Sequence, residues 1–486
     1  MILYVNNHIY HYELENLCRV FFPFSDLTVT EEKPDLSDDL ICVTESRNAD
    51  IEITVSVKLG DISKTEKNTL PQDTDTHTLE LTAARMLFTI LVNMLEYAPK
   101  WGVLTGVRPS KLMRMQIDAV GDEKAKEYFR DRLWVSDNKT ELAYSVAKRE
   151  DRIVKLSKPD SFSLYVSIPF CPTRCSYCSF VSHSIEQAKK LIPAYVENLC
   201  EELKITAEKA NENNLKLSTV YFGGGTPTSL TAQELYKITV AVNEYFDIEN
   251  CLEYTVEAGR PDTVTDEKFS VLKNAGVGRV SINPQTFNDA VLNVIGRRHT
   301  SEQTIEAYHL AEKYGFDINM DFIAGLPTDT VDSFINSIDT AVSLNPANIT
   351  VHTLALKRAS NLVSKYGIDK ETGDTMAMLD YADGKLAQNG YNPYYMYRQS
   401  RSIGNLENVG FALDNKECLY NVYMMEEIHT VLAVGGGAVT KLVNPYEYKI
   451  DRVFNFKYPY EYINRFDEIL DRKKQISEFY RSIGNV

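Results

Sequence analysis

From residue 160 onward the chain repeats one hydrophobic pattern, a short apolar run followed by a longer stretch with apolar residues every three or four positions. Short apolar runs bounded by glycine or polar residues predict buried strands, and the longer stretches predict amphipathic helices. We predict strands over 164–170, 217–222, 252–257, 278–283, 318–324, 349–356 and 391–397. We predict helices over 185–213, 232–245, 266–275, 289–295, 301–314, 331–344 and 375–388. The first six strands with their helices indicate an α/β fold with a parallel sheet or barrel, whose chemistry lies beyond the C-terminal strand ends.

The two ends of the chain follow other patterns. Apolar and polar residues alternate from Ile51 to Val57, as in a half-buried strand, and residues 79–95 read as a helix. The tail has a glycine-rich strand near 431–439, a hairpin, and a charged helix over 460–480. We therefore expect three parts, an N-terminal α+β domain, a catalytic domain and a short C-terminal extension, over residues 1–155, 156–400 and 401–486.

Composition and charge exclude some classes of partner. The chain has 486 residues, 44% hydrophobic and 25% charged, as in soluble globular proteins. A net charge of -16 argues against a large nucleic-acid surface and against an anionic membrane surface. The N-terminus has no basic leader, and the longest apolar stretch, around Met86 to Leu95, is short for a membrane span. We expect a cytoplasmic monomer that binds neither nucleic acid nor membrane.

Three of the eight cysteines stand together. Cys171, Cys175 and Cys178 fall within eight residues directly after a predicted strand, whereas the other five are scattered among apolar neighbours. Thiolates are the ligands of iron–sulfur clusters, and a four-iron cluster held by three cysteines keeps one iron open to a small molecule. The alternatives are three buried thiols or a zinc site, but zinc usually takes a second pair of ligands that this sequence lacks.

Further polar residues and glycines follow the next predicted strands. Gly223, Gly224, Gly225 and Thr226 end the second strand, where glycine lets the backbone approach a ligand; a tight turn is the alternative. The later strand ends carry single polar residues that, taken one by one, read equally as solvated caps: Glu257, Gln285, Arg297 and Asp321.

The spacing C-x3-C-x2-C, with Tyr177 before the third cysteine, resembles the radical S-adenosylmethionine (SAM) superfamily. That resemblance implies a partial (β/α)6 TIM-like barrel, a [4Fe-4S] cluster on the three cysteines, and SAM bound to the open iron. In this family an electron from the cluster breaks SAM into methionine and a 5′-deoxyadenosyl radical.

Over residues 160–400 the whole ordered set resembles the oxygen-independent coproporphyrinogen III oxidases, also called coproporphyrinogen dehydrogenases, and their HemZ-type branch. The resemblance implies two SAM molecules. The residues implied for the cluster-bound SAM are Tyr165, Tyr177, Gly224, Glu257 and Tyr394, of which Tyr165 and Glu257 are the catalytic candidates. Those implied for the second SAM are Gly225, Thr226, Gln285, Arg297, Asp321 and Ala355.

The same resemblance implies a reaction in haem biosynthesis. A propionate of coproporphyrinogen III loses hydrogen and CO2 to become a vinyl group, and two such steps give protoporphyrinogen IX. A reductase or a flavodoxin- or ferredoxin-type protein would supply electrons. A substrate with four carboxylates needs cations, for which the candidates are Lys357, Arg358, Arg398 and Arg401. The alternative is that these side chains only cap a sheet edge.

Two positions depart from the pattern of the oxidases. Ser167 stands where they carry histidine, and Phe180 stands where they carry a fourth cysteine. Serine cannot shuttle protons near neutral pH as histidine can. The related haem chaperones also carry Phe at the position of Phe180, so haem binding and delivery is a second hypothesis, with His352 as an axial ligand candidate. A radical SAM enzyme acting on another tetrapyrrole is a third.

Overall fold

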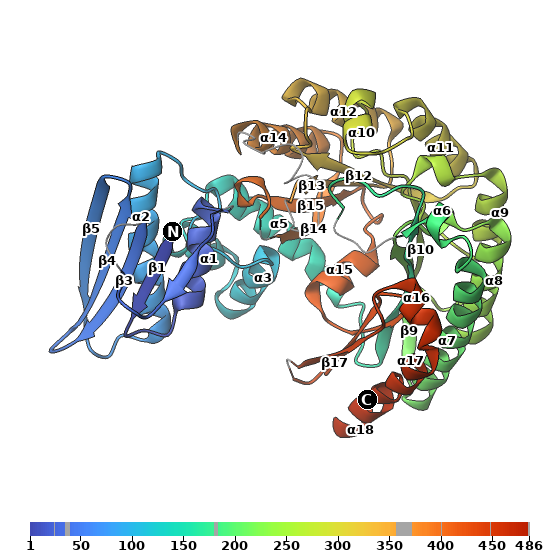
Figure 1. Cartoon of the computed structure of the whole chain (residues 1–486), viewed down its shortest axis with the longest axis horizontal. Helices are drawn as coiled ribbons and strands as arrows, with labels where there is room; N and C mark the ends of the chain where they lie inside the picture. Colours follow the sequence, from blue (N-terminus) through green and yellow to red (C-terminus); the bar gives the residue numbers. More distant parts are fainter. Residues whose placement is uncertain are drawn as a thin grey trace. The chain divides into compact units, whose positions relative to one another are not determined.

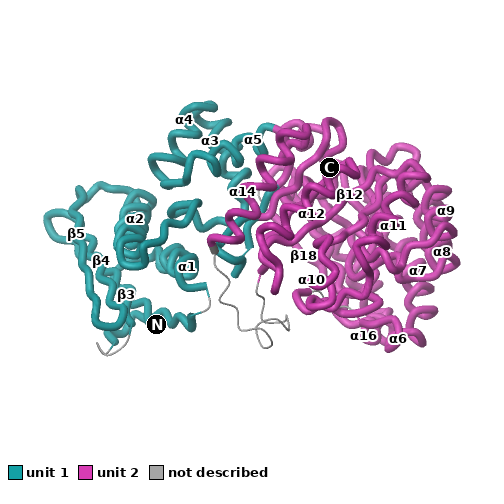
Figure 2. Tube along the Cα trace, turned by 90° about the horizontal axis from the view of Figure 1, so that it is seen from above, with its two compact units in different colours: residues 1–148, 396–407 teal, residues 149–395, 408–486 magenta. Residues whose placement is uncertain are grey.

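The computed structural model describes residues 1–23, 25–34, 39–178, 183–355, 372–399, 401–447 and 449–484. The chain forms two compact units, coloured separately in Figure 2. Unit 1 comprises residues 1–148 and 396–407, and unit 2 comprises residues 149–395 and 408–486. In this division the tail from residue 408 onward belongs to the same unit as the β/α repeats, and the short segment 396–407 belongs to unit 1.

Unit 1 is an α+β domain with one five-stranded sheet in the order β2-β1-β3-β4-β5. Its strands are β1 (Ile2–Asn6), β2 (Thr28–Thr30), β3 (Leu40–Arg47), β4 (Ile51–Leu59) and β5 (Ile62–Leu70). Its helices are α1 (His11–Phe21), α2 (Thr76–Leu95), α3 (Pro109–Val120), α4 (Asp122–Glu127) and most of α5 (Asp137–Val154). The alternate residues of β4 are fully buried, as the sequence pattern predicts, and α2 packs on this strand.

Helix α2 is longer than the apolar stretch around Met86 to Leu95, which by itself is short for a membrane span. Its 20 residues are long and apolar enough, by length and composition only, to cross a membrane. Half of the apolar window is buried inside the protein. A core helix of a soluble protein passes the same test, so α2 alone is weak support for a membrane span. The Asp75 side chain caps its first turn by accepting a hydrogen bond from the Thr78 N–H at 3.0 Å.

The segment 396–407 is held in unit 1 by buried charges. Lys139 Nζ lies 2.5 Å from Glu407 Oε1, and Trp101 Nε1 donates to Glu407 Oε2 at 2.7 Å. The Arg398 guanidinium donates to the carbonyls of Leu104, Gly106 and Asn405 and stacks over Trp101, and only 3% of this residue is exposed. Arg398 was predicted to bind a substrate carboxylate, whereas its Nε and Nη1 donate to backbone carbonyls of unit 1. Arg401 lies in the same segment of unit 1.

Unit 2 is built on an 11-stranded mixed sheet in the order β14-β15-β13-β12-β11-β10-β9-β6-β16-β17-β18. The strands that match the six predicted runs pair in parallel, in chain order: β6 (Ser161–Ile168), β9 (Lys216–Gly224), β10 (Glu253–Glu257), β11 (Arg279–Ser281), β12 (Asp317–Ala324) and β13 (Asn348–Thr353). The other strands are β14 (Asn392–Arg398), β15 (Glu407–Ala412), β16 (Thr430–Val434), β17 (Val439–Val443) and β18 (Ile450–Phe454), with the short pair β7 (Phe170–Cys171) and β8 (His183–Ser184). The mixed α/β class is therefore confirmed.

Helices line one side of this sheet, in an arc that Figure 1 shows from α7 to α12. They are α7 (Ile192–Glu212), α8 (Ala232–Tyr245), α9 (Asp266–Asn274), α10 (Asp289–Val294), α11 (Ser301–Lys313), α12 (Val331–Leu344) and α14 (Thr372–Gln388). The short helix α6 (Ile185–Ala188) packs on β7 and β8. The helix predicted over 185–213 is two helices. Pro193 stands in the first turn of α7, where its missing N–H is tolerated, and it cannot continue a preceding helix.

The C-terminal residues complete unit 2. Helix α15 (Leu419–Glu426) leads to β16, which pairs in parallel with β6. The single helix predicted over 460–480 is three, α16 (Pro459–Asn464), α17 (Phe466–Arg472) and α18 (Lys474–Ser482), all packed on α7. The buried Glu202 carboxylate on α7 accepts hydrogen bonds from Gly435 N, Asn455 Nδ2 and Tyr462 Oη at 2.7–2.8 Å and pairs with Lys473 at 2.8 Å. One acidic side chain thus connects α7 to four points of the tail.

Candidate active site

The cysteine loop lies beyond the C-terminal end of β6 and is fastened to a turn after α10. Cys171 ends β7, and the Cys178 N–H donates to the Cys175 carbonyl at 3.2 Å. The Ser176 N–H donates to the carbonyl of Ile295 at 3.0 Å, and Thr173 Oγ1 donates to that of Gly296 at 3.1 Å. These bonds give the thiol-bearing loop a defined position over the strand ends.

The glycine-rich turn after β9 packs closely against the same loop. Gly224 has φ +105°, and a Cβ added to Gly225 would lie 2.6 Å from the Phe170 carbonyl oxygen, so a side chain has no room there. The Thr226 N–H donates to the Phe170 carbonyl at 2.7 Å, and Thr226 Oγ1 donates to Cys171 Sγ at 3.5 Å. The glycines were predicted to let the backbone approach a ligand; the close approach that the structure shows is to the backbone of the cysteine loop.

Three tyrosines and one carboxylate form the inner wall of unit 2. Tyr165 and Tyr221 are paired across β6 and β9, and Tyr420 of α15 stacks on both, with ring centroids 6.2 and 4.3 Å away. Tyr221 Oη donates to Glu257 Oε1 at 2.6 Å. Tyr221 and Tyr420 were missed by the sequence reasoning. Tyr221 precedes the glycines by two residues, but nothing in the sequence connects Tyr420 to strands more than 190 positions away.

Burial changes the protonation of Glu257. Enclosure by protein raises the pKa of this carboxyl from 4.5 to about 7; the hydrogen bond from Tyr221 opposes the rise and the charge of Asp321 adds to it. The carboxyl can therefore hold or release a proton near neutral pH, a property common to acid–base groups in active sites.

The dependence of the free energy of unfolding on pH tests the raised pKa of Glu257. The folded chain binds the Glu257 proton more tightly than the unfolded chain, so the free energy of unfolding falls as the pH rises from about 4.5 through 7. We expect this fall to be about 2 kcal/mol smaller in Glu257→Gln, measured by urea denaturation of the apoprotein at pH 5 and pH 8. Glu249→Gln, at an exposed position, is the matched control. An unchanged pH dependence in Glu257→Gln would contradict the assignment.

Asp321 and its neighbours form the next part of the wall. Asn283 Nδ2 donates to Asp321 Oδ2 at 2.9 Å, and His352 Nε2 lies 3.9 Å from the same oxygen. Gln285 bridges to β12 through its backbone and has φ +68°, a conformation unusual for a residue with a side chain. Such local strain is characteristic of functional sites. The structure thus brings Gln285 and Asp321 together, with the Gln285 N–H donating to the Asp321 carbonyl at 2.9 Å.

Arg297 lies behind the cysteine loop. Its Nη1 donates to the carbonyls of Gly259 and Asn283, and its Nη2 donates to Tyr177 Oη at 3.1 Å. Among the described residues, its buried Nε has no hydrogen-bond partner, and neither has the buried Oδ1 of Asn283. A buried donor and acceptor without partners are costly, and a polar ligand would satisfy them.

The cysteine loop fits an iron–sulfur cluster by its donor chemistry. Every cysteine of the chain is a thiol rather than half of a disulfide. The Thr226 hydroxyl faces Cys171, and the guanidinium of Arg260 faces Cys175, so donors and positive charge surround the sulfur atoms. Across the described ranges, no three His, Cys, Asp or Glu side chains converge to hold one metal ion. A four-iron cluster binds its thiolates through different irons and does not require such convergence.

Tyr394 is corrected, because it lies toward the other end of the strands. Its hydroxyl accepts a hydrogen bond from Asn421 Nδ2 at 3.1 Å, and Cys418 and Arg279 are among its neighbours. Arg279 begins β11, beside a cavity of about 540 Å³ whose walls include Glu253 and Asp317. Those side chains pair with Arg279 itself, which makes this end of the sheet structural.

Several predicted positions are not tested by contacts. Ala355 follows β13 and is the last described residue before a gap. Lys357, Arg358 and Phe180 lie outside the described residues.

The fold and the cysteine loop define a radical SAM protein: the pattern of the radical SAM superfamily matches residues 165–341. In overall fold the chain is similar to coproporphyrinogen III oxidase (HemN) from Escherichia coli, with a TM-score of 0.51 and 23% identity over 65% of this chain and 71% of that one. At this identity the likeness supports the fold alone.

Two curated relatives are similar in sequence. The oxygen-independent coproporphyrinogen-III oxidase-like protein HemZ of Bacillus subtilis is 36% identical over 477 residues, which are 95% of this chain and 94% of that protein. The heme chaperone HemW of Lactococcus lactis is 31% identical over 332 residues, 66% of this chain and 80% of that one. The chain therefore belongs to the HemZ-like family of the radical SAM superfamily. Membership implies a [4Fe-4S] cluster and SAM.

Proposed function

We propose that this protein is an anaerobic radical SAM oxidoreductase of haem biosynthesis that converts propionates of coproporphyrinogen III to vinyl groups. The observation that carries the proposal is the likeness to the HemZ oxidase-like protein along 95% of the chain, unit 1 included. The strand order of unit 2 supports a partial (β/α)6 barrel, with the proposed chemistry at the C-terminal ends of the strands.

The residues around the site can be given roles in this reaction. Cys171, Cys175 and Cys178 would hold the cluster, which when bound supplies the electron that cleaves SAM. Arg297, with its spare buried donor, suits a carboxylate of SAM, and Asp321 suits an ammonium group or ribose hydroxyls. Tyr165, backed by the tyrosine stack, would present a flat apolar wall.

The substrate step transfers a hydrogen atom and an electron. Each propionate that becomes a vinyl group loses one hydrogen atom, one CO2 and one electron, which a redox partner protein must accept. The Ser167 hydroxyl, at the position where the oxidases carry histidine, donates to the Gly436 carbonyl at 2.9 Å. We assign to Glu257, which is held by Tyr221 and whose pKa is raised to about 7, a contact with the cluster-bound SAM.

The remaining partners are also part of the proposal. We propose a cytoplasmic monomer that receives electrons from a reductase or a flavodoxin- or ferredoxin-type protein. A second function, haem binding and delivery, is favoured by the HemW likeness over 66% of the chain and by Phe180, a phenylalanine that the related haem chaperones also carry at this position.

One anaerobic assay separates these functions. The reconstituted protein is incubated with reductant, SAM and coproporphyrinogen III, and the products are analysed by chromatography and mass spectrometry. The proposal expects one CO2 for each vinyl group formed, and therefore two CO2 for each protoporphyrinogen IX. Formation of 5′-deoxyadenosine alone means that the substrate is a different molecule. A haem Soret band on titration with haem, with no turnover of coproporphyrinogen III, identifies the delivery protein instead.

A further inference from the structure

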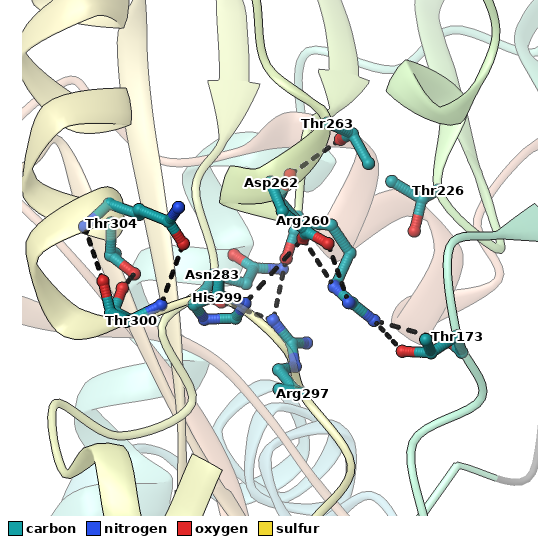
Figure 3. A network of polar contacts seen from close by, with 12 residues as sticks. Thr173, Thr226, Arg260, Asp262, Thr263, Asn283, Arg297, His299, Thr300 and Thr304 are labelled. Atoms are coloured by element: carbon teal, nitrogen blue, oxygen red, sulfur yellow. Dashed lines mark hydrogen bonds and ion pairs between the residues drawn. The ribbon is translucent and has the colours of Figure 1, made fainter. Parts of the chain in front are cut away.

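A second buried arginine, which the sequence reasoning did not single out, faces the cysteine loop. Arg260 follows β10 by three residues and is 3% exposed. Its Nη1 donates to Thr173 Oγ1 at 3.0 Å and to the Thr173 carbonyl at 3.4 Å, and it approaches Cys175 Sγ at 3.9 Å. Figure 3 shows this guanidinium reaching from the strand end to the Thr173 side of the loop.

Asp262 holds this guanidinium in one orientation. Arg260 Nε donates to Asp262 Oδ1 at 3.0 Å and Nη2 donates to Oδ2 at 3.1 Å, a two-point pairing that fixes the plane of the group. The third nitrogen, Nη1, is thereby directed at Thr173 and Cys175. The positive end of the ion pair therefore lies nearer to the Cys175 sulfur than the negative end does.

His299 closes the other side of Asp262 without adding charge. Its ring is fully buried, with Nδ1 3.9 Å from Asp262 Oδ1 (Figure 3). Burial, together with the neighbouring charges of Arg297 and Arg260, lowers the pKa of His299 to about 3. The imidazole is neutral at any working pH, so the local charge is set by the two arginines and Asp262.

We propose that Arg260 is a positioning residue that raises the reduction potential of the cluster through Cys175. Asp262 orients the Arg260 guanidinium and partly offsets its positive charge. This inference rests on the proposed binding of a cluster by the three cysteines. A fixed positive charge in a buried site favours the more negative, reduced state of a nearby cluster. Hydrogen bonds to ligand sulfur atoms act in the same direction.

Two substitutions are expected to shift the reduction potential of the cluster in opposite directions. Arg260→Gln removes the positive charge and leaves Asp262 negative, so we expect the equilibrium constant for one-electron reduction to fall about tenfold, a shift of about 59 mV to more negative potential. Asp262→Asn leaves the guanidinium charged without its counter-charge, so we expect a shift to more positive potential. Arg298→Gln, one residue from Arg297 but exposed, should leave the potential unchanged.

The measurement is a redox titration of the reconstituted full chain, followed by electron paramagnetic resonance, with iron content and thermal stability recorded for each variant. Iron content reports on the proposed binding of a cluster, whereas the reduction potential reports on the proposed role of Arg260. The two hypotheses can therefore be refuted separately. A purely structural role would lower stability in both variants without opposite shifts in potential. Shifts of the same sign, or none, overturn the proposal. If Arg260→Gln does not retain iron, the potential of Asp262→Asn decides: a shift to more positive potential supports the proposal, and no shift or a negative shift overturns it.

Discussion

We expect the Cys175→Ala variant to bind at least about tenfold less iron than the unaltered chain after anaerobic reconstitution, because a cluster ligand contributes more to metal affinity than the residues that support it. Cys175 is buried in a loop that backbone bonds hold to the turn at Ile295, so no other thiol can take its place without moving the loop. The variant should also lose reductive SAM cleavage. The measurements are iron and sulfide content and the absorbance of the reconstituted protein.

Cys200→Ala is the matched control for this experiment. Cys200 lies on α7, and its thiol donates to the Lys237 carbonyl at 3.8 Å, in a helix–helix contact. We expect it to retain iron and SAM cleavage. Full iron retention by Cys175→Ala, or a loss of iron in Cys200→Ala of the same size, would contradict the cluster assignment.

The largest expected loss of stability comes from Glu202→Ala. This carboxylate is fully buried, and its removal leaves the Lys473 ammonium, 2% exposed, without its counter-charge in the protein interior. Breaking a buried pair from one side costs about 3–5 kcal/mol, because an uncompensated charge stays buried. Three hydrogen bonds from the tail are lost with it, those of Gly435, Asn455 and Tyr462. Urea denaturation followed by circular dichroism measures the change.

The neighbouring residue and the partner lysine provide the controls. Glu201→Ala removes an exposed carboxylate one position earlier on the same helix and should change the free energy of unfolding by less than about 0.5 kcal/mol. In Glu202→Gln/Lys473→Met neither charge remains, so the double variant should be more stable than Glu202→Ala. Equal losses in Glu201→Ala and Glu202→Ala would show that the tail does not depend on this contact.

Much of the catalytic unit could be predicted because its signals are local. The six parallel strands appear as apolar runs, since a strand covered on both faces needs apolar residues throughout. The glycines after β9 indicated a close backbone approach, which the structure makes to Phe170, and the cysteine spacing indicated the loop that carries the three thiols. Helix ends were less accurate: the break before α7 depends on one proline, which the periodic pattern of apolar residues conceals.

The errors share one cause, which is contact between residues far apart in the chain. Tyr394 lies in the strand predicted over 391–397 and Arg398 directly follows that strand; both were assigned to ligands, and both lie on β14. The structure commits Arg398 to carbonyl groups from residues 104–106 and places the Tyr394 hydroxyl against Asn421. Cationic and aromatic residues suit a porphyrinogen equally well in either place, so residue type could not distinguish these contacts from a substrate site.

By itself, the sequence determined the α/β repeat, the thiolate loop, the glycine turn and the carboxylates at the strand ends, because each depends on residues close together in the chain. Only the tertiary structure decided three further features. They are the parallel pairing of the tail with β6, the stacking of Tyr420 on Tyr165 and Tyr221, and the approach of Arg260 to Cys175. The reason is physical: burial, stacking and charge depend on distance in space, and the chain brings these residues together only when the sheet of unit 2 has formed.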